Sequence, residues 1–472
     1  MHRSFSHIRK GAITSLLRDV PLRTIWGLVW PQMMMLLCSI IINLTDIWTA
    51  GRISSDVQAS VGISFQLQVF LLVFGMALGS GGMAAVSQSM GAGKTWRAQN
   101  YVGLVLASSV SIAVVVAGLV WSFRGATLDL LQTPEPLLSA TDYMVRIMLM
   151  GLPFAYVTQV CGTLFRAARQ VIAPLLVVMA SCLLNVVGDL CFGLGWLGCP
   201  ALGMEGIAWS TLVANAVAAA LSVYFLKRGG LISSRVVPSV RWLKLGAPYL
   251  FKVALPACGN SMLWHAGYLV MYGITAALPD GVSALAGLTA GNRIESLLYM
   301  PATAFMVTAS ILVGNALGAG NRALARRTGL VLFVISGCSM SAVAALMWPF
   351  IPELSGFFSS DSSVQTQIVN YLFFNVPVVP FTVSGLVLHG VMNGAGATIY
   401  SLIVNMSCIW FVRLPLGWGL AHFVFHDAYG VYMAMFISMV IQTSAMVWVF
   451  FRKDWARFAL NAHTHNNHKE KE

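Results

Sequence analysis

The sequence predicts an all-α integral membrane protein in which twelve transmembrane helices form two pseudo-symmetric six-helix lobes. Three observations lead to this prediction: the composition, the spacing of the apolar segments and an internal repeat. Hydrophobic residues make up 58% of the 472-residue chain and charged residues only 9%, whereas a soluble domain carries about 25% charged residues. Because water could not solvate so apolar a surface, the chain is expected to lie in a lipid bilayer.

Apolar segments long enough to cross a bilayer core, which takes about 20 helical residues, recur along the whole chain. In the first half they cover residues 24–47, 57–86, 101–122, 143–164, 171–193 and 202–226. In the second half they cover residues 250–276, 283–316, 328–350, 367–390, 397–420 and 429–451. Each half therefore contributes six predicted spans.

Lys and Arg are concentrated in every second loop between these spans. The net charge of +12 would fit a nucleic-acid partner, but basic residues in alternate short loops are what the positive-inside rule requires, so no nucleic acid is expected. Both termini are therefore predicted to be cytoplasmic, in a multi-pass protein of the plasma membrane (the inner membrane in a Gram-negative bacterium). The basic N-terminus leads directly into a full-length span, so no cleavable signal peptide is predicted.

An internal repeat relates the two halves. Residues 86–98 read VSQSMGAGKTWRA and residues 313–325 read VGNALGAGNRALA, a shift of 227 positions. Because each half has an even number of spans, both halves share one orientation and should be related by an axis along the membrane normal. The predicted organisation is a cytoplasmic N-terminus (1–23), a first lobe (24–226), a cytoplasmic linker (227–249), a second lobe (250–451) and a cytoplasmic tail (452–472).

The linker, the tail and the cysteines each carry a smaller prediction. Trp242 and its apolar neighbours in the linker predict a short amphipathic helix on the inner membrane surface. The polar tail is expected to be disordered rather than a metal site, although it contains His463, His465 and His468. The eight cysteines are interpreted as small apolar side chains, with a bridge between Cys191 and Cys199 left open.

Ionisable residues inside predicted spans mark the candidate functional positions, because a charge at the bilayer centre costs roughly 2.5–3.5 kcal/mol. Asp46 lies near the end of the first span, and Pro31 in the same span removes a helical hydrogen bond and favours a bend. Asp189 lies at a similar depth in the fifth span, and Asn185, four residues earlier, shares its helix face. Two neighbouring carboxylates in a low-dielectric setting should bind a proton more readily. The alternative is that each Asp ends its helix at the outer interface.

The second half offers a different set of candidates for a cavity: Arg413, His265, Arg293 and Glu295. Arg293 and Glu295 are two residues apart and would not share a helix face, and Arg413 either lines the cavity or pairs with Glu295. The sequence contains no HExxH, GxSxG or P-loop motif. No catalytic residue, cofactor or metal is therefore predicted, and any pumping must use an ion gradient.

At this point the chain resembles the multidrug and toxic compound extrusion (MATE) family, over essentially all of residues 15–452. The resemblance rests on the order of several short motifs: the span from Pro31 to Asp46, Gly91-Ala92-Gly93, Gly318-Ala319-Gly320, Leu184-Asn185…Asp189, Gly203…Gly206-Ile207-Ala208…Thr211, Asn393-Gly394-Ala395-Gly396-Ala397-Thr398 and Arg413-Leu414-Pro415-Leu416. It implies a MATE-like fold of two six-helix lobes and cation-coupled export of amphipathic organic compounds.

Within that family the chain looks closest to the DinF-like branch. This resemblance implies that Asp46, Asn185, Asp189 and Thr211 form the cation-coupling site and that Pro31 is where the first helix bends. The NorM-like branch has an acid in its seventh span, whereas residues 256–265 here contain none, and residues 371–392 of the tenth span also lack one. Coupling is therefore expected in the first lobe.

The expected function is that of a secondary active antiporter that exports amphipathic or cationic organic compounds in exchange for protons. It would act as a monomer in contact with membrane lipids. Sodium coupling is the first alternative, because two carboxylates and an Asn can bind either cation. A lipid-linked precursor flippase has a similar helical core but usually more basic cavities. A membrane-embedded enzyme is disfavoured because His265 and His389 are isolated in the sequence.

Overall fold

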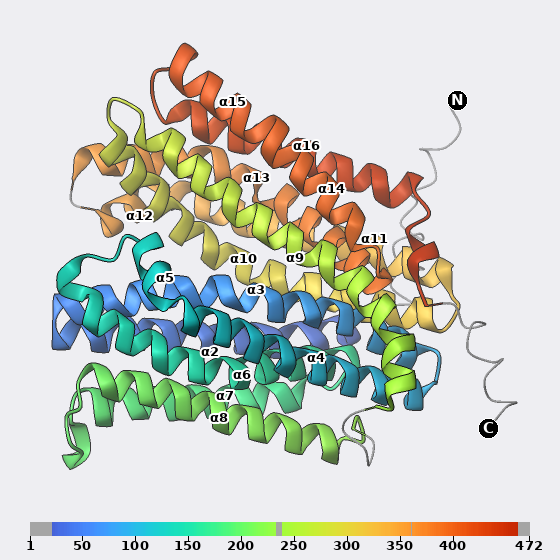
Figure 1. Cartoon of the computed structure of the whole chain (residues 1–472). Coiled ribbons are helices and arrows are strands. Elements are labelled where there is room, and N and C mark those ends of the chain that lie inside the picture. Colours follow the sequence, from blue (N-terminus) through green and yellow to red (C-terminus); the bar gives the residue numbers. More distant parts are fainter. Residues whose placement is uncertain (1–20, 233–237, 360, 461–472) are drawn as a thin grey trace, which may run out of the picture. The chain divides into compact units, whose positions relative to one another are not determined.

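The structure, a computed structural model, describes residues 21–232, 238–359 and 361–460. Within these residues the chain consists of helices and their connections, with no strand (Figure 1). The predicted histidine-containing end of the tail and most of the predicted N-terminal segment lie outside the described residues.

The twelve predicted spans all fall on long helices. In the first half these are α2 (Leu22–Ile53), α3 (Ser55–Gly91), α4 (Thr95–Ser122), α6 (Leu138–Ala167), α7 (Ile172–Gly188), extended by the π-helical turn η2 (Asp189–Gly193), and α8 (Met204–Arg228). In the second half they are α9 (Val240–Ala276), α10 (Gly281–Gly318), α11 (Arg322–Met347), α13 (Ser362–Ala395), the broken helix α14 (Thr398–Cys408), η5 (Ile409–Arg413), α15 (Leu414–Gly419) and η6 (Leu420–Val424), and finally α16 (Tyr429–Arg452). Eleven of these spans have the length and hydropathy needed to cross a membrane by themselves, and α9 is the twelfth long helix.

Several short helices were not predicted, because they are too brief to produce an apolar run. They are α5 (Arg124–Leu130), α12 (Ile351–Phe358) and the single turns η1 (Glu135–Leu137), η3 (Trp196–Gly198), η4 (Trp348–Phe350) and η7 (Trp455–Phe458). The predicted surface helix around Trp242 is instead the start of α9. Trp242 is buried there, with its ring centroid 4.9 Å from that of Tyr101, so packing rather than the membrane surface accommodates its indole.

The chain forms two compact units. The first unit is Trp30–Ala254, and the second contains the described residues from Leu255 onward together with residues 21–29. The helices α2 and α9 each pass from one unit to the other immediately before a proline, Pro31 and Pro256 respectively. Each proline removes one backbone hydrogen bond from its helix.

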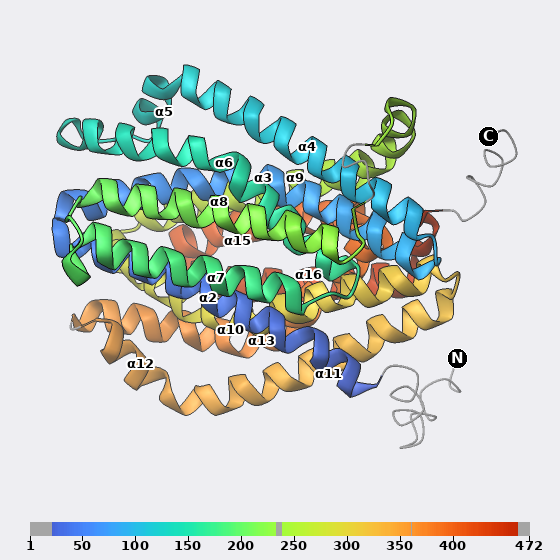
Figure 2. The same cartoon turned by 90° about the horizontal axis from the view of Figure 1, so that it is seen from below.

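The packing inside the two units repeats, as the sequence repeat predicts. In the first unit α3 packs on α4 and α6, and α6 packs on α8 (Figure 2). In the second unit α10 packs on α11 and α13, and α13 packs on α16. The two Gly-Ala-Gly turns also match: Gly93 and Gly320 are left-handed, with φ of 69° and 77°. In both turns the next amide, of Lys94 or Asn321, donates to the carbonyl five residues earlier at 3.0 Å, which is a Schellman helix end.

Glycines allow the central helix pair of each unit to pack closely, through a side chain in the first unit and at backbone distance in the second. A Cβ on Gly79 of α3 would lie 3.2 Å from the Thr163 hydroxyl of α6. A Cβ on Gly390 or Gly394 of α13 would lie 2.1 or 2.3 Å from a backbone oxygen of α10. Such close contacts are how membrane helices associate without a hydrophobic driving force.

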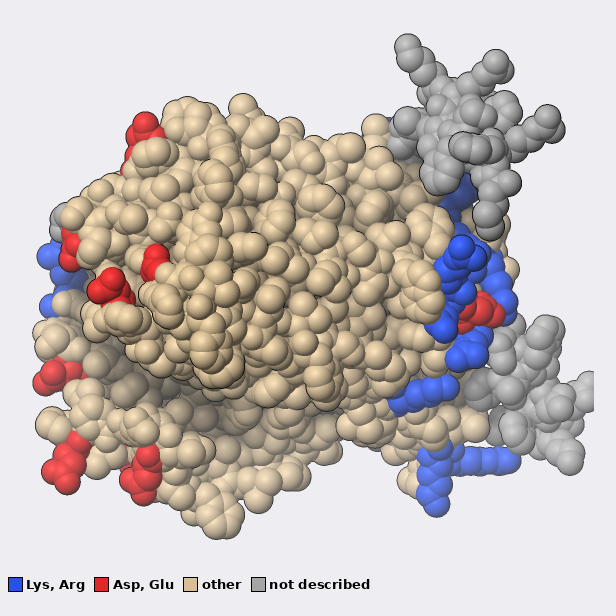
Figure 3. Space-filling view, turned by 90° about the horizontal axis from the view of Figure 1, so that it is seen from above, with Lys and Arg blue, Asp and Glu red and all other residues tan. Residues whose placement is uncertain are grey.

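Most exposed charged side chains lie toward the ends of the long helices, whereas Asp189, Glu295 and Arg413 are buried. On the face drawn in Figure 3, Lys and Arg gather mainly at one end of the helices and most Asp and Glu lie at the other, with an uncharged band between them. This segregation is the pattern expected of a multi-pass membrane protein.

Candidate functional site

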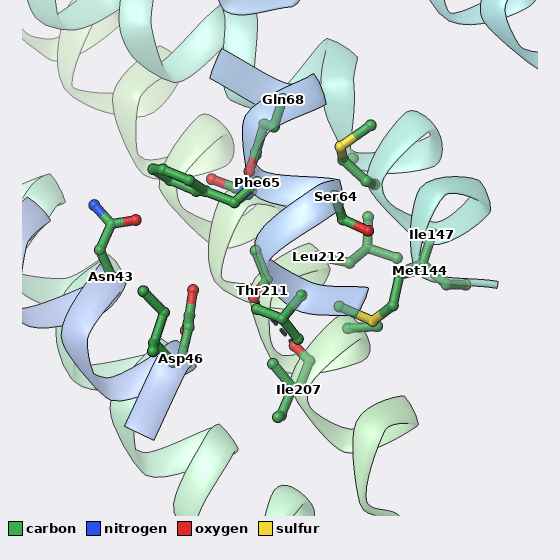
Figure 4. Close-up of a pocket in the computed structure, with 16 residues that line it drawn as sticks. Asn43, Asp46, Ser64, Phe65, Gln68, Met144, Ile147, Ile207, Thr211 and Leu212 are labelled. Atoms are coloured by element: carbon green, nitrogen blue, oxygen red, sulfur yellow. Dashed lines mark hydrogen bonds between the residues drawn. The ribbon is translucent and has the colours of Figure 1, made fainter. Parts of the chain in front are cut away.

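A pocket opens inside the first unit between α2, α3, α6 and α8. The space open to the centres of water-sized molecules is about 70 Å³, and all the empty space, including that at the open mouth, is about 670 Å³. Apolar side chains, among them Val61, Phe65 and Met144, form most of its wall. The polar lining residues are Asn43, Asp46, Ser64, Gln68, Thr211 and Asn215. Figure 4 shows Asp46 on one wall and Thr211 on another, both directed toward the space between them.

Asp46 and Asp189 lie next to each other at different depths. Asp46, on α2, is partly exposed and lines the pocket. Asp189 is fully buried and does not reach the pocket wall. The two carboxyl groups are close enough to form a hydrogen bond when one of them carries a proton. The pair therefore places the carboxyl group of Asp46, which faces the pocket, next to that of Asp189, which is buried behind the pocket wall.

Glycines explain why Asp189 is held so deeply. It is the first residue of the π-helical turn η2, which follows α7 without a break. A Cβ on Gly188 would lie 2.6 Å from the Ser210 hydroxyl, and one on Gly206 would lie 2.2 Å from the carbonyl oxygen of Phe192. Since neither position carries a Cβ, α8 packs directly against the backbone of α7 and η2. A π turn inside an α-helix is frequently found at a functional site.

Asn185 links this carboxylate pair to the pocket wall. Its Nδ2 donates to the Thr211 hydroxyl at 3.1 Å, and Thr211 donates in turn to the Ile207 carbonyl at 3.1 Å. Asn185 is also near enough to Asp46 to interact with its carboxylate. The structure thus brings together the four residues that the sequence predicted, from α2, α7 with η2, and α8.

The site has more buried acceptors than donors. Asp46 Oδ1, both carboxylate oxygens of Asp189 and Asn185 Oδ1 are buried and have no hydrogen-bond partner within the described part of the chain. Burying acceptors without partners is costly. A single proton on either carboxyl group would supply a donor to this cluster.

Pro31 lies in the same helix as Asp46, about four turns away at 3.6 residues per turn, and α2 continues unbroken through it. The missing amide leaves the carbonyl of Gly27 without its intrahelical partner. Among the described residues, a Cβ on Gly27 would meet no atom within 4 Å, so these residues leave space beside this point in the helix.

The other predicted residues lie in the second unit and separate into two groups. Arg413 and Glu295 are buried, 1% and 4% exposed, whereas Arg293 and His265 are exposed. Arg413 Nε donates to the Ser438 hydroxyl at 2.8 Å. No ion pair between Arg413 and Glu295 occurs in the described residues, although the two are near enough to interact electrostatically. Cys191 and Cys199, for which a bridge was left open, are present as free thiols.

A second polar cluster, in the second unit, was not predicted. Asn405 Nδ2 donates to Asn260 Oδ1 at 2.7 Å, and Gln442 Nε2 donates to Asn405 Oδ1 at 2.7 Å. Asn405 lies four residues before the π-helical turn η5, as Asn185 lies four residues before η2. At the repeat's shift of 227 positions Asn185 falls on Val412, so the repeat by itself did not indicate this cluster. It is neutral, where its counterpart in the first unit contains two carboxylates.

Comparisons with known proteins agree with this architecture. A sequence model of the family described as MatE matches residues 31–191 and 256–418. Probable multidrug resistance protein YoeA of Bacillus subtilis (strain 168) is 23% identical over 86% of this chain and 89% of that protein. Protein DETOXIFICATION 39 of Arabidopsis thaliana is 25% identical over 92% of this chain and 85% of that protein.

Solved structures share the fold at low identity. The Vibrio cholerae MATE transporter VcmN in the bent form superposes with a TM-score of 0.85 at 19% identity, covering 95% of this chain and 99% of that one. A MOP superfamily transporter from Pyrococcus furiosus gives 0.84 at 19% identity, with 96% and 99% covered.

Proposed function

This chain belongs to the MatE family, whose members are multidrug and toxic-compound efflux transporters rather than enzymes, and from that premise we propose that it exports amphipathic organic compounds, cationic ones among them, in exchange for protons. The observation that carries the coupling is the arrangement of Asp46 and Asp189. Asp46 faces the pocket, and the buried Asp189 lies beside it.

A proton is well suited to this pair. Removing a carboxylate from water is costly unless a cation compensates it, and neither Asp takes part in an ion pair among the described residues. Two adjacent carboxylates also repel each other. One proton held between them relieves both penalties and gives the unpartnered oxygens a donor.

The pocket position of Asp46 makes exchange possible. A cationic compound in the pocket is attracted to ionised Asp46, and a proton that neutralises the carboxylate removes that attraction. Proton and substrate therefore exclude each other, which is the requirement for antiport. The apolar wall, with Phe65 and Met144, accommodates apolar parts of different shapes, since Met side chains adapt readily.

Bending of α2 would link protonation to release. The proton must interact differently with the straight and bent forms, because a ligand shifts an equilibrium only by its differential affinity. Neutral Asp46 costs less than the charged form in a pocket that loses its water. A bend at Pro31, where a hydrogen bond is already missing, would then narrow the pocket. The bent form described for VcmN is a related precedent.

Sodium is the second candidate, and one observation favours keeping it. The carboxylate oxygens of Asp46 and Asp189, with the carbonyl of Asn185 and the hydroxyl of Thr211, are hard oxygen ligands. The corresponding cluster of the second unit, Asn260, Asn405 and Gln442, has no carboxylate. Either cation would therefore use the first unit.

Transport by the purified protein in liposomes distinguishes the two cations. An imposed pH gradient, acid on the outer side, should drive movement of a cationic dye in sodium-free buffer. The control is the same gradient collapsed by a protonophore, which should stop the movement. Dye movement that requires sodium at every pH would contradict proton coupling and leave the transporter assignment standing.

A further inference from the structure

The second unit contains a buried acid that the proposed function does not use. Glu295, on α10, is surrounded by hydroxyl groups: Tyr299 and Tyr371 each donate to one of its carboxylate oxygens. Tyr371 itself is fully buried on α13, and its ring packs edge-on against Tyr432 of α16 at 5.4 Å. The carboxyl group is therefore held by two tyrosines from two helices and sealed from solvent.

The hydrogen bonds continue beyond Glu295 as a chain. The Tyr371 hydroxyl also lies 2.8 Å from the side-chain amide of Asn292, and the other end of that amide lies 3.3 Å from the Tyr272 hydroxyl of α9. Each hydroxyl has one hydrogen to donate, and a carboxamide has both a donor and an acceptor end. The chain can therefore run in either direction.

The two directions correspond to the two charge states of Glu295. With an ionised carboxylate, Asn292 donates to Tyr371 and Tyr371 donates to Glu295. With a protonated carboxyl group, Glu295 donates to Tyr371, Tyr371 donates to the Asn292 carbonyl, and the amide donates to Tyr272. Rotation of hydroxyls and of one amide is all that separates these states, so every group is partnered in both.

Arg413 supplies a fixed charge next to this chain. Its guanidinium lies over the Trp264 ring at 5.6 Å, and its Nη2 is buried with no hydrogen-bond partner in the described residues. Tyr268 is near enough to both Arg413 and Glu295 to interact with them electrostatically. The cluster is neutral when Glu295 is ionised and carries one positive charge when Glu295 is protonated.

We propose that Glu295 is a second proton-binding site, held in the second unit by the chain Glu295–Tyr371–Asn292–Tyr272 and balanced by Arg413. A proton from water forms an O–H bond on the carboxylate and leaves by the reverse step, with no other bond changed. The titratable and charged groups that face Glu295 are Tyr268, Tyr272, Tyr299, Tyr371 and Arg413. The inference goes beyond the proposed function, since Glu295 would bind its proton whether or not Asp46 and Asp189 couple transport.

Infrared difference spectroscopy on the purified protein in liposomes tests proton binding by Glu295 without any transport assay. The starting point is the double variant Asp46→Asn with Asp189→Asn, which removes the two acids of the candidate site. Lowering the pH should still produce the carbonyl-stretch band of a newly protonated buried carboxyl group. Adding Glu295→Gln should abolish that band. The matched control is Glu353→Gln, an exposed acid of the same unit, which should leave the band intact.

A second variant keeps the test valid if Glu295→Gln fails to fold. Tyr371→Phe keeps the ring and removes one hydrogen bond, so it should shift both the frequency of the band and the pH at which it appears. The proposal is overturned if the double variant shows no protonated-carboxyl band, or if the band is unchanged by both Glu295→Gln and Tyr371→Phe.

Discussion

Two residues of the same type occupy different positions at the candidate site, and this difference defines their proposed roles. Asp46 is partly exposed to the pocket, whereas Asp189 is fully buried at the start of η2. The proposed exchange needs both: one carboxyl group that meets the substrate, and one that shares the proton away from it. A change that removes only the charge should separate these roles.

Asp46→Asn is expected to abolish dye export driven by a pH gradient, because the amide mimics a permanently protonated carboxyl group. The protein should still insert and fold, since Asn is nearly isosteric with Asp. Export is measured in liposomes beside Asp129→Asn, an exposed acid of the same unit, which should export at the unmodified rate. Export by Asp46→Asn at the unmodified rate would reduce Asp46 to a helix-end residue.

A second prediction at the residue scale concerns the left-handed turn after α10. Gly320 has φ of 77°, and a Cβ there would meet no atom of the described residues within 4 Å. Gly320→Ala should therefore cost about 1 kcal/mol of stability through backbone strain alone. The measurement is the melting temperature in detergent. The control is Gly356→Ala, in helix α12 with equally open space, which should be neutral or slightly stabilising.

At the scale of elements, the two helices that pass between the units share one feature. Both α2 and α9 cross the unit boundary directly before a proline. A helix bends most easily where a hydrogen bond is missing, so these two points are where each helix can change direction at least cost. In α2 the same helix also carries Asp46.

Pro31→Ala is therefore expected to slow export while leaving the proton site intact. Alanine restores the missing hydrogen bond and stiffens α2. Turnover should fall, whereas the pH dependence of dye binding should stay as in the unmodified protein. Pro380→Ala, in α13 within the second unit, serves as the comparison and should change turnover less. Unchanged turnover in Pro31→Ala would argue against bending at this point.

For the whole molecule, the distribution of basic residues predicts a direction across the membrane. Lys94 and Arg97 follow α3, and Arg322, Arg326 and Arg327 follow α10 at the equivalent turn of the repeat. Because loops rich in Lys and Arg remain on the cytoplasmic side, both Gly-Ala-Gly turns should lie in the cytoplasm. The loop that contains Pro134 should lie outside.

Cysteine labelling in whole cells checks this orientation. In a background without the native cysteines, Thr95→Cys and Asn321→Cys should react only with a membrane-permeant reagent. Pro134→Cys should also react with an impermeant one. All three positions are exposed, so a lack of labelling would not reflect burial. Reaction of either turn with the impermeant reagent would reverse the predicted topology.

The sequence alone was sufficient to predict the twelve spans, the repeat and the four residues that lie around Asp46. Hydropathy and loop charge are local properties, read over windows of about 20 residues, and a repeat appears as direct similarity between two stretches. Asn185 and Asp189 could be placed on one helix face because helical spacing is regular. Asp46 was associated with them by its similar depth in the first span, and Thr211 only through the order of motifs in the resemblance.

Only the tertiary structure decided which of these groups is buried and what surrounds the second-unit acid. Tyr371 meets Glu295 across 76 positions of sequence, and Asn405 meets Asn260 across 145. No periodicity encodes contacts at such separations, because they depend on how whole helices pack. Glycines let α8 pack against η2 and α13 pack against α10, and so set the distances between these helices. The burial of Asp189 and the hydroxyl partners of Glu295 follow from that packing.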